Sequence, residues 1–358
     1  MGSRTDRRVH GSHRGPSARR RLLLGALVAA GISSVLDPGA ARAANQEPAG
    51  INLGLTSFFD GFGKGDAGFV YLTYAFYQVG HRLNDDMGNE QTIFGKPKIN
   101  DFVWINQLAL FAPETIFGGA ARPGLNVIWA TLIALDTDFS SASPAPGFQL
   151  TNNGVGTGDL TTGVFLQFKP IFAGGRPVFV HRVEFDVMAP IGSYDPHKDI
   201  NQGANFASLA PYWAFTVLPL HRLEISARFN YLYNFTNHRP ANPFPVDPPV
   251  DSVKPGQAFW VNYAASFEVL EHIHLGVNGY YFTQLTQDRY TYADGSSGDG
   301  PQNYVLGDFG FAKMIALGPG VFWDASKTNK VFLNAYFSVK VDNRPQQNTF
   351  NLHYIHEF

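Results

Sequence analysis

The residues most able to do chemistry in this sequence are charged side chains that recur within otherwise apolar stretches. Arg182, Glu184 and Asp186 alternate with valine and phenylalanine, so an extended strand would place all three on one face. The full set of such residues is Arg182, Glu184, Asp186, Glu224, Arg228, Glu268 and Lys340. Inside a barrel these side chains would line a wet lumen and set its electric field. The alternative is that they form mixed-sign pairs that stabilise a filled interior, because buried charges are tolerated when paired.

The sequence shows no strong pattern for catalysis or metal binding. His272 and His274 fall at an expected tight turn, and His353 and His356 fall on opposite faces of an expected strand, so neither pair converges as metal coordination requires. The chain has no cysteine, and therefore no thiolate ligand, thiol nucleophile or disulfide. A G-x-S-x-G nucleophile motif does not occur. We expect no enzyme activity, no metal and no cofactor.

Alternating strands are the elements that would position the charges. The final stretch, residues 348–358, carries large apolar or aromatic residues at every second position and ends on Phe358. Residues 223–233, 259–269 and 331–341 likewise have one face without charge. An uncharged strand face requires an apolar medium beside it. The pattern predicts an all-β fold, a closed antiparallel up-and-down transmembrane β-barrel of about 12 strands.

The strand rhythm covers most of the chain. We expect strands at residues 69–79, 102–111, 125–136, 160–168, 178–188, 207–217, 222–235, 258–270, 274–285, 310–323, 331–341 and 348–358. Their connections mostly alternate between long segments rich in Gly, Pro, Asn and Asp and short turns. This asymmetry is typical of a barrel with long external loops and tight periplasmic turns.

Composition agrees with a membrane barrel and excludes other classes. Of 358 residues, 44% are hydrophobic and only 16% are charged, against about a quarter in ordinary soluble domains. The formal net charge of -2 supplies no basic field for nucleic acid. We expect outer-membrane lipid, small hydrophobic solutes and, through the terminal Phe358, the outer-membrane assembly machinery as partners.

Residues 1–43 have the layout of a secretory signal peptide. Seven arginines precede the apolar residues 22–30, and residues 41–43 read A-R-A before a cleavage point at Ala44. The arginines also resemble a twin-arginine signal, but a barrel that stays unfolded until it reaches its membrane has no reason to be exported folded. We expect residues 44–358 to form one barrel in the Gram-negative outer membrane.

Residues 44–66 precede the first expected strand and carry a cluster of aromatic side chains. Phe58, Phe59 and Phe62 could fold into the lumen as a gate or as a contact surface for an apolar solute. A periplasmic lead-in or an additional strand is the alternative. The five tryptophans are expected in the aromatic belts at the two membrane interfaces; they are Trp104, Trp129, Trp213, Trp260 and Trp323.

Four short motifs follow one another along the chain: GTGDL at residues 156–160, APIGSYD at 189–195, LGVNGYYFTQLTQD at 275–288 and LGPGV at 317–321. In these motifs the sequence resembles the meta-pathway phenol-degradation family of outer-membrane proteins. The resemblance implies an outer-membrane barrel associated with catabolism of aromatic or other hydrophobic compounds, which it helps to cross the membrane. It implies no catalytic residues.

Taken together, these patterns predict a channel for passive uptake of small hydrophobic or aromatic, phenol-like compounds. The alternative is a closed structural or surface-binding outer-membrane barrel without conduction. A third reading, a secreted soluble sandwich or lipid-binding barrel, would require the uncharged strand faces to be buried in protein. The nearly cancelling signs of the candidate lumen charges argue against strong ion selectivity.

Overall fold

Twelve long antiparallel strands close into a barrel in the computed structural model, which describes residue 2 and residues 51–91, 97–140, 149–241, 248–299 and 311–358. Each strand pairs with its neighbour in the chain, and β19 pairs with β1 to close the barrel. The strands are β1 (Gly68–Leu83), β2 (Lys98–Phe111), β3 (Ala121–Ala134), β7 (Leu160–Phe168), β9 (Arg176–Ala189), β10 (Ser208–Val217), β11 (Leu223–Asn234), β13 (Ala258–Leu270), β14 (Ile273–Gln284), β17 (Lys313–Asp324), β18 (Asn329–Asp342) and β19 (Pro345–Glu357). The predicted fold class is confirmed.

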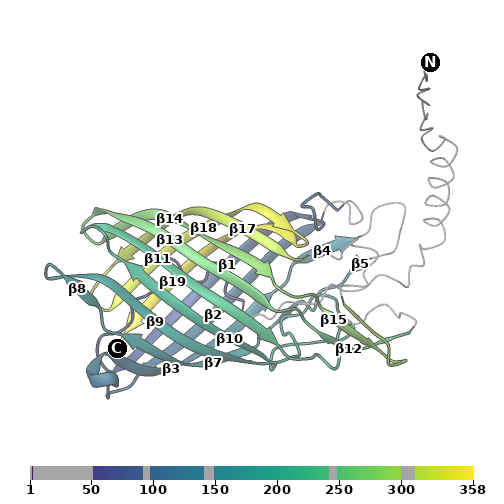
Figure 1. Ribbon diagram of the computed structural model, residues 1–358, viewed down its shortest axis with the longest axis horizontal. Coiled ribbons are helices and arrows are strands. Elements are labelled where there is room, and N and C mark those ends of the chain that lie inside the picture. The colour runs from purple at the N-terminus through teal and green to yellow at the C-terminus, as the bar shows by residue number, and fades with distance from the viewer. Residues whose placement is uncertain (1, 3–50, 92–96, 141–148, 242–247, 300–310) are drawn as a thin grey trace. The chain divides into compact units, whose positions relative to one another are not determined.

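Short elements lie in the connections between the long strands. They are β4 (Thr137–Ser140), β5 (Gln149–Leu150), β6 (Val155–Gly156), β8 (Ile171–Ala173), β12 (Val250–Lys254), β15 (Arg289–Tyr292), β16 (Ser297–Asp299) and a 3-10 turn at Phe117–Gly119. Elements β4, β5, β12 and β15 lie at one end of the barrel, and β8 lies at the other end with the C-terminus (Figure 1). The long loops therefore gather at one end and the short turns at the other, as the loop lengths predict. The exceptions are the two-residue turn between β18 and β19 and the connection between β2 and β3, which is longer than the other short turns.

The barrel wall is apolar outside and polar inside. Large apolar side chains stand exposed on the outer face along most strands, among them Leu108, Val127, Val164, Phe185, Phe229, Phe267, Val277, Leu333, Phe350 and Leu352. Buried polar side chains occupy the alternate positions and include Asn126, Asn230, Asn262, Asn278, Asn334 and Asn351. This arrangement reverses that of a soluble protein and fits an outer face against lipid. Among the described residues, none forms a helix with the length and apolar character needed to span a bilayer.

A β-bulge changes the orientation of one predicted residue. The register of β17 and β18 shifts between Ile315, which pairs with Lys340, and Ala316, which pairs with Ser338. The extra residue reverses the alternation beyond it. Val341 therefore packs inside the barrel, and Lys340 lies outside, with 60% of its side chain exposed. The prediction that Lys340 lines the lumen is wrong for this reason.

Candidate functional site: a plugged barrel lumen

Residues 51–64, here called the plug, lie inside the barrel before β1 begins. Inward-facing side chains of the wall hydrogen-bond the plug backbone. Asn262 of β13 accepts from the Gly54 N–H at 3.1 Å, Thr216 of β10 accepts from the Gly61 N–H at 2.9 Å, and Asn351 of β19 donates to the Gly54 carbonyl at 3.1 Å. Irregular backbone at membrane depth is tolerated when the protein satisfies its polar groups in this way. The signal-peptide prediction lies outside the described residues, apart from Gly2.

One buried ion pair fastens the centre of the plug to β11. The Arg228 guanidinium donates to both carboxylate oxygens of Asp60, from Nε at 2.9 Å and from Nη2 at 2.5 Å. The side chains are 10% and 6% exposed. Beside this pair, Glu224 accepts from the Phe59 N–H at 2.9 Å and from the Ser266 hydroxyl at 2.7 Å. A two-point arginine–carboxylate contact fixes orientation as well as charge, so Arg228 and Glu224 hold the plug in register.

The three phenylalanines of the plug occupy different surroundings in the lumen. Phe58 is buried against Ala264, Phe322 and Phe332, and it lies directly over Gly276 and Gly320, where an added Cβ would approach its ring to 2.7 Å. Phe59 meets Phe62 edge to face, with ring centroids 5.8 Å apart. The wall glycines therefore leave room for Phe58.

Trp260 departs from the predicted aromatic belt. It is 1% exposed and points into the barrel, where its Nε1 donates to Asn52 Oδ1 of the plug at 2.7 Å. The other four tryptophans, Trp104, Trp129, Trp213 and Trp323, are exposed on the outer face. A buried tryptophan needs a partner for its N–H, and the plug supplies it.

The predicted charges Arg182 and Glu184 form a neighbouring network on β9, two strands away from Arg228 of β11. Tyr212 of the intervening β10 links the two, since its ring lies 4.1 Å from the Arg228 guanidinium. Arg182 Nη2 lies 2.5 Å from Glu184 Oε2, and Glu184 also accepts from the Tyr212 hydroxyl and from Asn126 Nδ2. Asn126 in turn accepts from Gln107. Asp186 is buried next to this network, whereas Glu268 is half-buried at the short-turn end. These ion pairs and hydrogen bonds link neighbouring strands of the wall, and their positive and negative charges nearly cancel.

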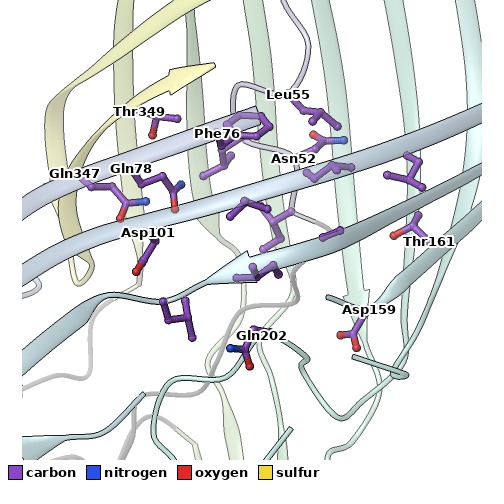
Figure 2. A pocket seen from close by; sticks show the side chains of 18 of the residues that line it. Asn52, Leu55, Phe76, Gln78, Asp101, Asp159, Thr161, Gln202, Gln347 and Thr349 are labelled. Atoms are coloured by element: carbon purple, nitrogen blue, oxygen red, sulfur yellow. The ribbon is translucent and has the colours of Figure 1, made fainter. Parts of the chain in front are cut away.

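Two cavities lined by described residues lie beside the plug. The outer cavity, of about 270 Å³, lies toward the long loops, and the inner cavity, of about 470 Å³, lies toward the short turns. Figure 2 shows the outer cavity with Asn52 and Leu55 from the plug, Phe76 from β1, and Gln202 from the connection between β9 and β10. A dry cavity of about 150 Å³ already accommodates benzene, so each cavity is large enough for a small aromatic molecule.

Apolar side chains of β1, β2 and β3 form a strip along both cavities, interrupted at Gln107 of β2, which accepts from the Tyr74 hydroxyl at 2.7 Å. The strip consists of Val70, Leu72, Phe76, Val103, Ile105, Ala109, Phe111, Ile128, Ala130 and Ile133. Within the described residues, the hydrogen bonds between plug and wall end instead on β7, β10, β11, β13, β18 and β19. The plug is therefore fastened to one side of the lumen and only packed against the other.

The two cavities are separated at one place. Leu55 of the plug and Ile128 of β3 line both of them, and within the described part of the chain no other residue does. Leu55 is 4% exposed and packs against Tyr74 and Phe76 of β1. An apolar constriction can pass an apolar solute while it opposes water and ions.

A loop covers the outer end of the lumen and is held by Asp159. The two carboxylate oxygens accept from the backbone N–H groups of Gly192 and Ala204, at 2.9 and 2.8 Å. Burial raises the pKa of the Asp159 carboxyl, although both hydrogen bonds act in the opposite direction. Asp159 and Gly192 belong to two of the short motifs in the sequence. Those motifs therefore fold the connection between β9 and β10 over the barrel.

The family model described as "Putative MetA-pathway of phenol degradation" matches residues 80–354, which is most of the chain. The protein belongs to this family. No curated protein matches the sequence. The match confirms the resemblance seen in the short motifs, and it covers the barrel strands from the end of β1 to β19.

A solved structure with a TM-score above 0.5 supports the fold of this phenol-degradation family member. The crystal structure of the COG4313 outer membrane channel from Pseudomonas putida F1 has a TM-score of 0.65 and 14% identity, over 84% of this chain and 98% of that one. A deltaS2S3 mutant of the TodX monoaromatic hydrocarbon channel has a TM-score of 0.43 and 9% identity, over 82% and 91%. The chain has the fold of an outer-membrane β-barrel. Among its described residues, no group of three or more histidine, aspartate or glutamate side chains is placed to hold a metal ion.

Proposed function

We propose that this protein is an outer-membrane channel for the passive uptake of small hydrophobic or aromatic, phenol-like compounds. The observation that carries the proposal is the division of the lumen into a polar side, which binds the plug, and an apolar strip on β1–β3 that lines both cavities. A solute moving along this strip exchanges one apolar contact for another and breaks no plug–wall hydrogen bond. The family description, phenol degradation, supports an aromatic solute.

The path runs from the outer cavity, past Leu55 and Ile128, to the inner cavity and the short turns. Phe58, Phe59 and Phe62 line the inner cavity and serve as the aromatic contact surface there. The lumen charges Arg182, Glu184, Asp186, Glu224 and Arg228 hold the wall and the plug in place, and Glu268 borders the inner mouth. Their role is to position the apolar path.

The outer membrane is the place where such a channel would act. The apolar outer face fits surrounding lipid, and the arginine-rich leader fits export through a cleaved signal peptide. Phe358 lies at the short-turn end, where the assembly machinery would bind it. Faster migration of the unheated protein than of the boiled protein on a denaturing gel tests for a stable membrane barrel.

Deletion of the gene is expected to slow uptake of phenol-like compounds. At limiting external concentration, passage through the outer membrane limits the rate, so a strain without the channel should accumulate labelled 4-methylphenol more slowly than the parent. Complementation with the intact gene should restore the rate. Equal uptake by the parent and the deletion strain would remove the transport claim.

A closed structural or surface-binding barrel is the second candidate function. The plug favours this candidate because the plug fills the centre of the lumen. The two candidates differ in reconstituted liposomes. A channel accelerates entry of the neutral aromatic solute over protein-free liposomes, whereas a closed barrel leaves the rate unchanged.

A further inference from the structure

The outer cavity contains hydrogen-bond acceptors that the protein itself does not use. Asp186 and Gln202 line it and are 4% and 1% exposed. Asp186 Oδ1 and Gln202 Oε1 are both buried without a hydrogen-bond partner. A buried acceptor without a donor is energetically costly, so a molecule that brings a donor to either oxygen is stabilised.

The barrel makes specific room for the Asp186 carboxyl. Gly163 on β7 is the residue paired with Asp186 on β9, and a Cβ at position 163 would lie 2.0 Å from Asp186 Oδ1. Glycine in the middle of a strand is destabilising relative to alanine. Any larger residue would displace the carboxyl, so the chain tolerates this cost at the position where Asp186 needs the space.

The other carboxylates of the outer cavity are already engaged. Both oxygens of Asp159 accept from backbone N–H groups, and Asp101 Oδ1 accepts from the Asp136 N–H and the Thr137 hydroxyl. Phe76, Val103 and Ile105 of the apolar strip line the same cavity. The cavity thus offers an apolar wall together with two oxygens that have no donor.

We propose that the outer cavity is a selection site for an apolar ring that carries one neutral hydroxyl group. The ring packs against β1–β3, and its O–H donates to Asp186 Oδ1 or Gln202 Oε1. An ammonium group fits less well because it has three donors to satisfy and a far larger desolvation cost. The inference rests on the proposed channel function and adds that the hydroxyl, as well as the ring, is recognised.

The test compares binding of 4-methylphenol and 4-methylanisole to the full-length protein in nanodiscs, with empty nanodiscs as the blank. The two ligands share the ring and the oxygen, but only the phenol has a donor. We expect the phenol to bind about tenfold more tightly, the factor that corresponds to one net hydrogen bond. Asp186→Leu and, independently, Gln202→Met should reduce this ratio toward one. Asp324→Leu is the matched control, because Asp324 Oδ1 is also buried without a partner but lines the inner cavity.

Equal affinity of the wild-type protein for both ligands, or an unchanged ratio in both outer-cavity variants, would overturn the selection site. Tighter binding of 4-methylbenzylammonium than of 4-methylphenol would overturn the choice of a neutral donor. The ratio is measured within each variant, so a general loss of affinity does not imitate the result. Binding with the expected ratio but without transport refutes the channel and leaves the site, whereas equal transport of both ligands refutes the site and leaves the channel.

Discussion

Asp60→Leu is expected to release the plug and give a pore that opens to ions. The substitution removes both acceptors of the Arg228 guanidinium, which is 10% exposed, and leaves a buried charge without its counter-ion. Removal of one partner from a buried pair costs about 3–5 kcal/mol, and each 1.4 kcal/mol is tenfold in an equilibrium constant. The population with the plug undocked should rise by a factor of about 10²–10⁴. Planar-bilayer recording measures this as the frequency of opening events.

Two control variants separate the ion pair from other causes. Asp66→Leu makes the same change at an exposed position just beyond the plug, and it should leave the opening frequency unchanged. The double variant Asp60→Leu/Arg228→Leu removes both charges, so no unpaired charge stays buried and much of the wild-type closure should return. A single variant that stays as closed as the wild type would show that the backbone hydrogen bonds hold the plug without the ion pair. Mobility of the unheated protein on a gel verifies that each barrel has formed.

Strand positions could be predicted from the sequence because alternation is a local property. A side chain in a strand faces lipid or lumen according to the parity of its position, so the uncharged face of residues 223–233 already determines which side of β11 is outside. The same parity places Arg182, Glu184 and Asp186 together inside. Twelve predicted strands correspond to the twelve long strands of the structure.

The odd or even position of a residue no longer predicts which face it occupies where the backbone departs from a regular strand. The bulge opposite Ile315 and Ala316 inverts β18 beyond Ser338, and nothing in the residue types of that stretch marks it. Lys340 was therefore assigned to the wrong face. A bulge depends on the neighbouring strand as well as on its own residues, so a single sequence does not reveal it.

The docking of the plug could not be predicted because it depends on pairs distant in the chain, such as Asp60 and Arg228. Some signals were nevertheless present. Gly276 and Gly320 weaken strands for no local reason, and the structure shows Phe58 above both. Trp260 gives a second such signal. The parity of its position places it on the polar, inward face of β13, which differs from the membrane-interface location predicted for the tryptophans as a group.

Ile128→Trp is expected to block the solute path at its narrowest point. Ile128 lies between the two cavities with Leu55 opposite, and a larger side chain there fills the space that a solute must cross. Entry of 4-methylphenol into liposomes that contain this variant should fall to the rate of protein-free liposomes. Val127→Trp is the matched control, because Val127 is the adjacent residue of β3, is 43% exposed and faces outward.

Leu55→Ala tests the same constriction from the plug side and should act in the opposite direction. Truncation of a buried leucine costs about 2–5 kcal/mol of packing, and the space released joins the two cavities, so neutral solute should enter faster. The ion pair of Asp60 remains in this variant, so ion-conducting openings should rise less than in Asp60→Leu. Faster solute entry with fewer ion openings than Asp60→Leu would separate movement along the apolar strip from loss of the plug. If Ile128→Trp and Val127→Trp instead passed solute equally, the path would not run between Leu55 and Ile128, and the apolar strip would have to be a surface that packs the plug.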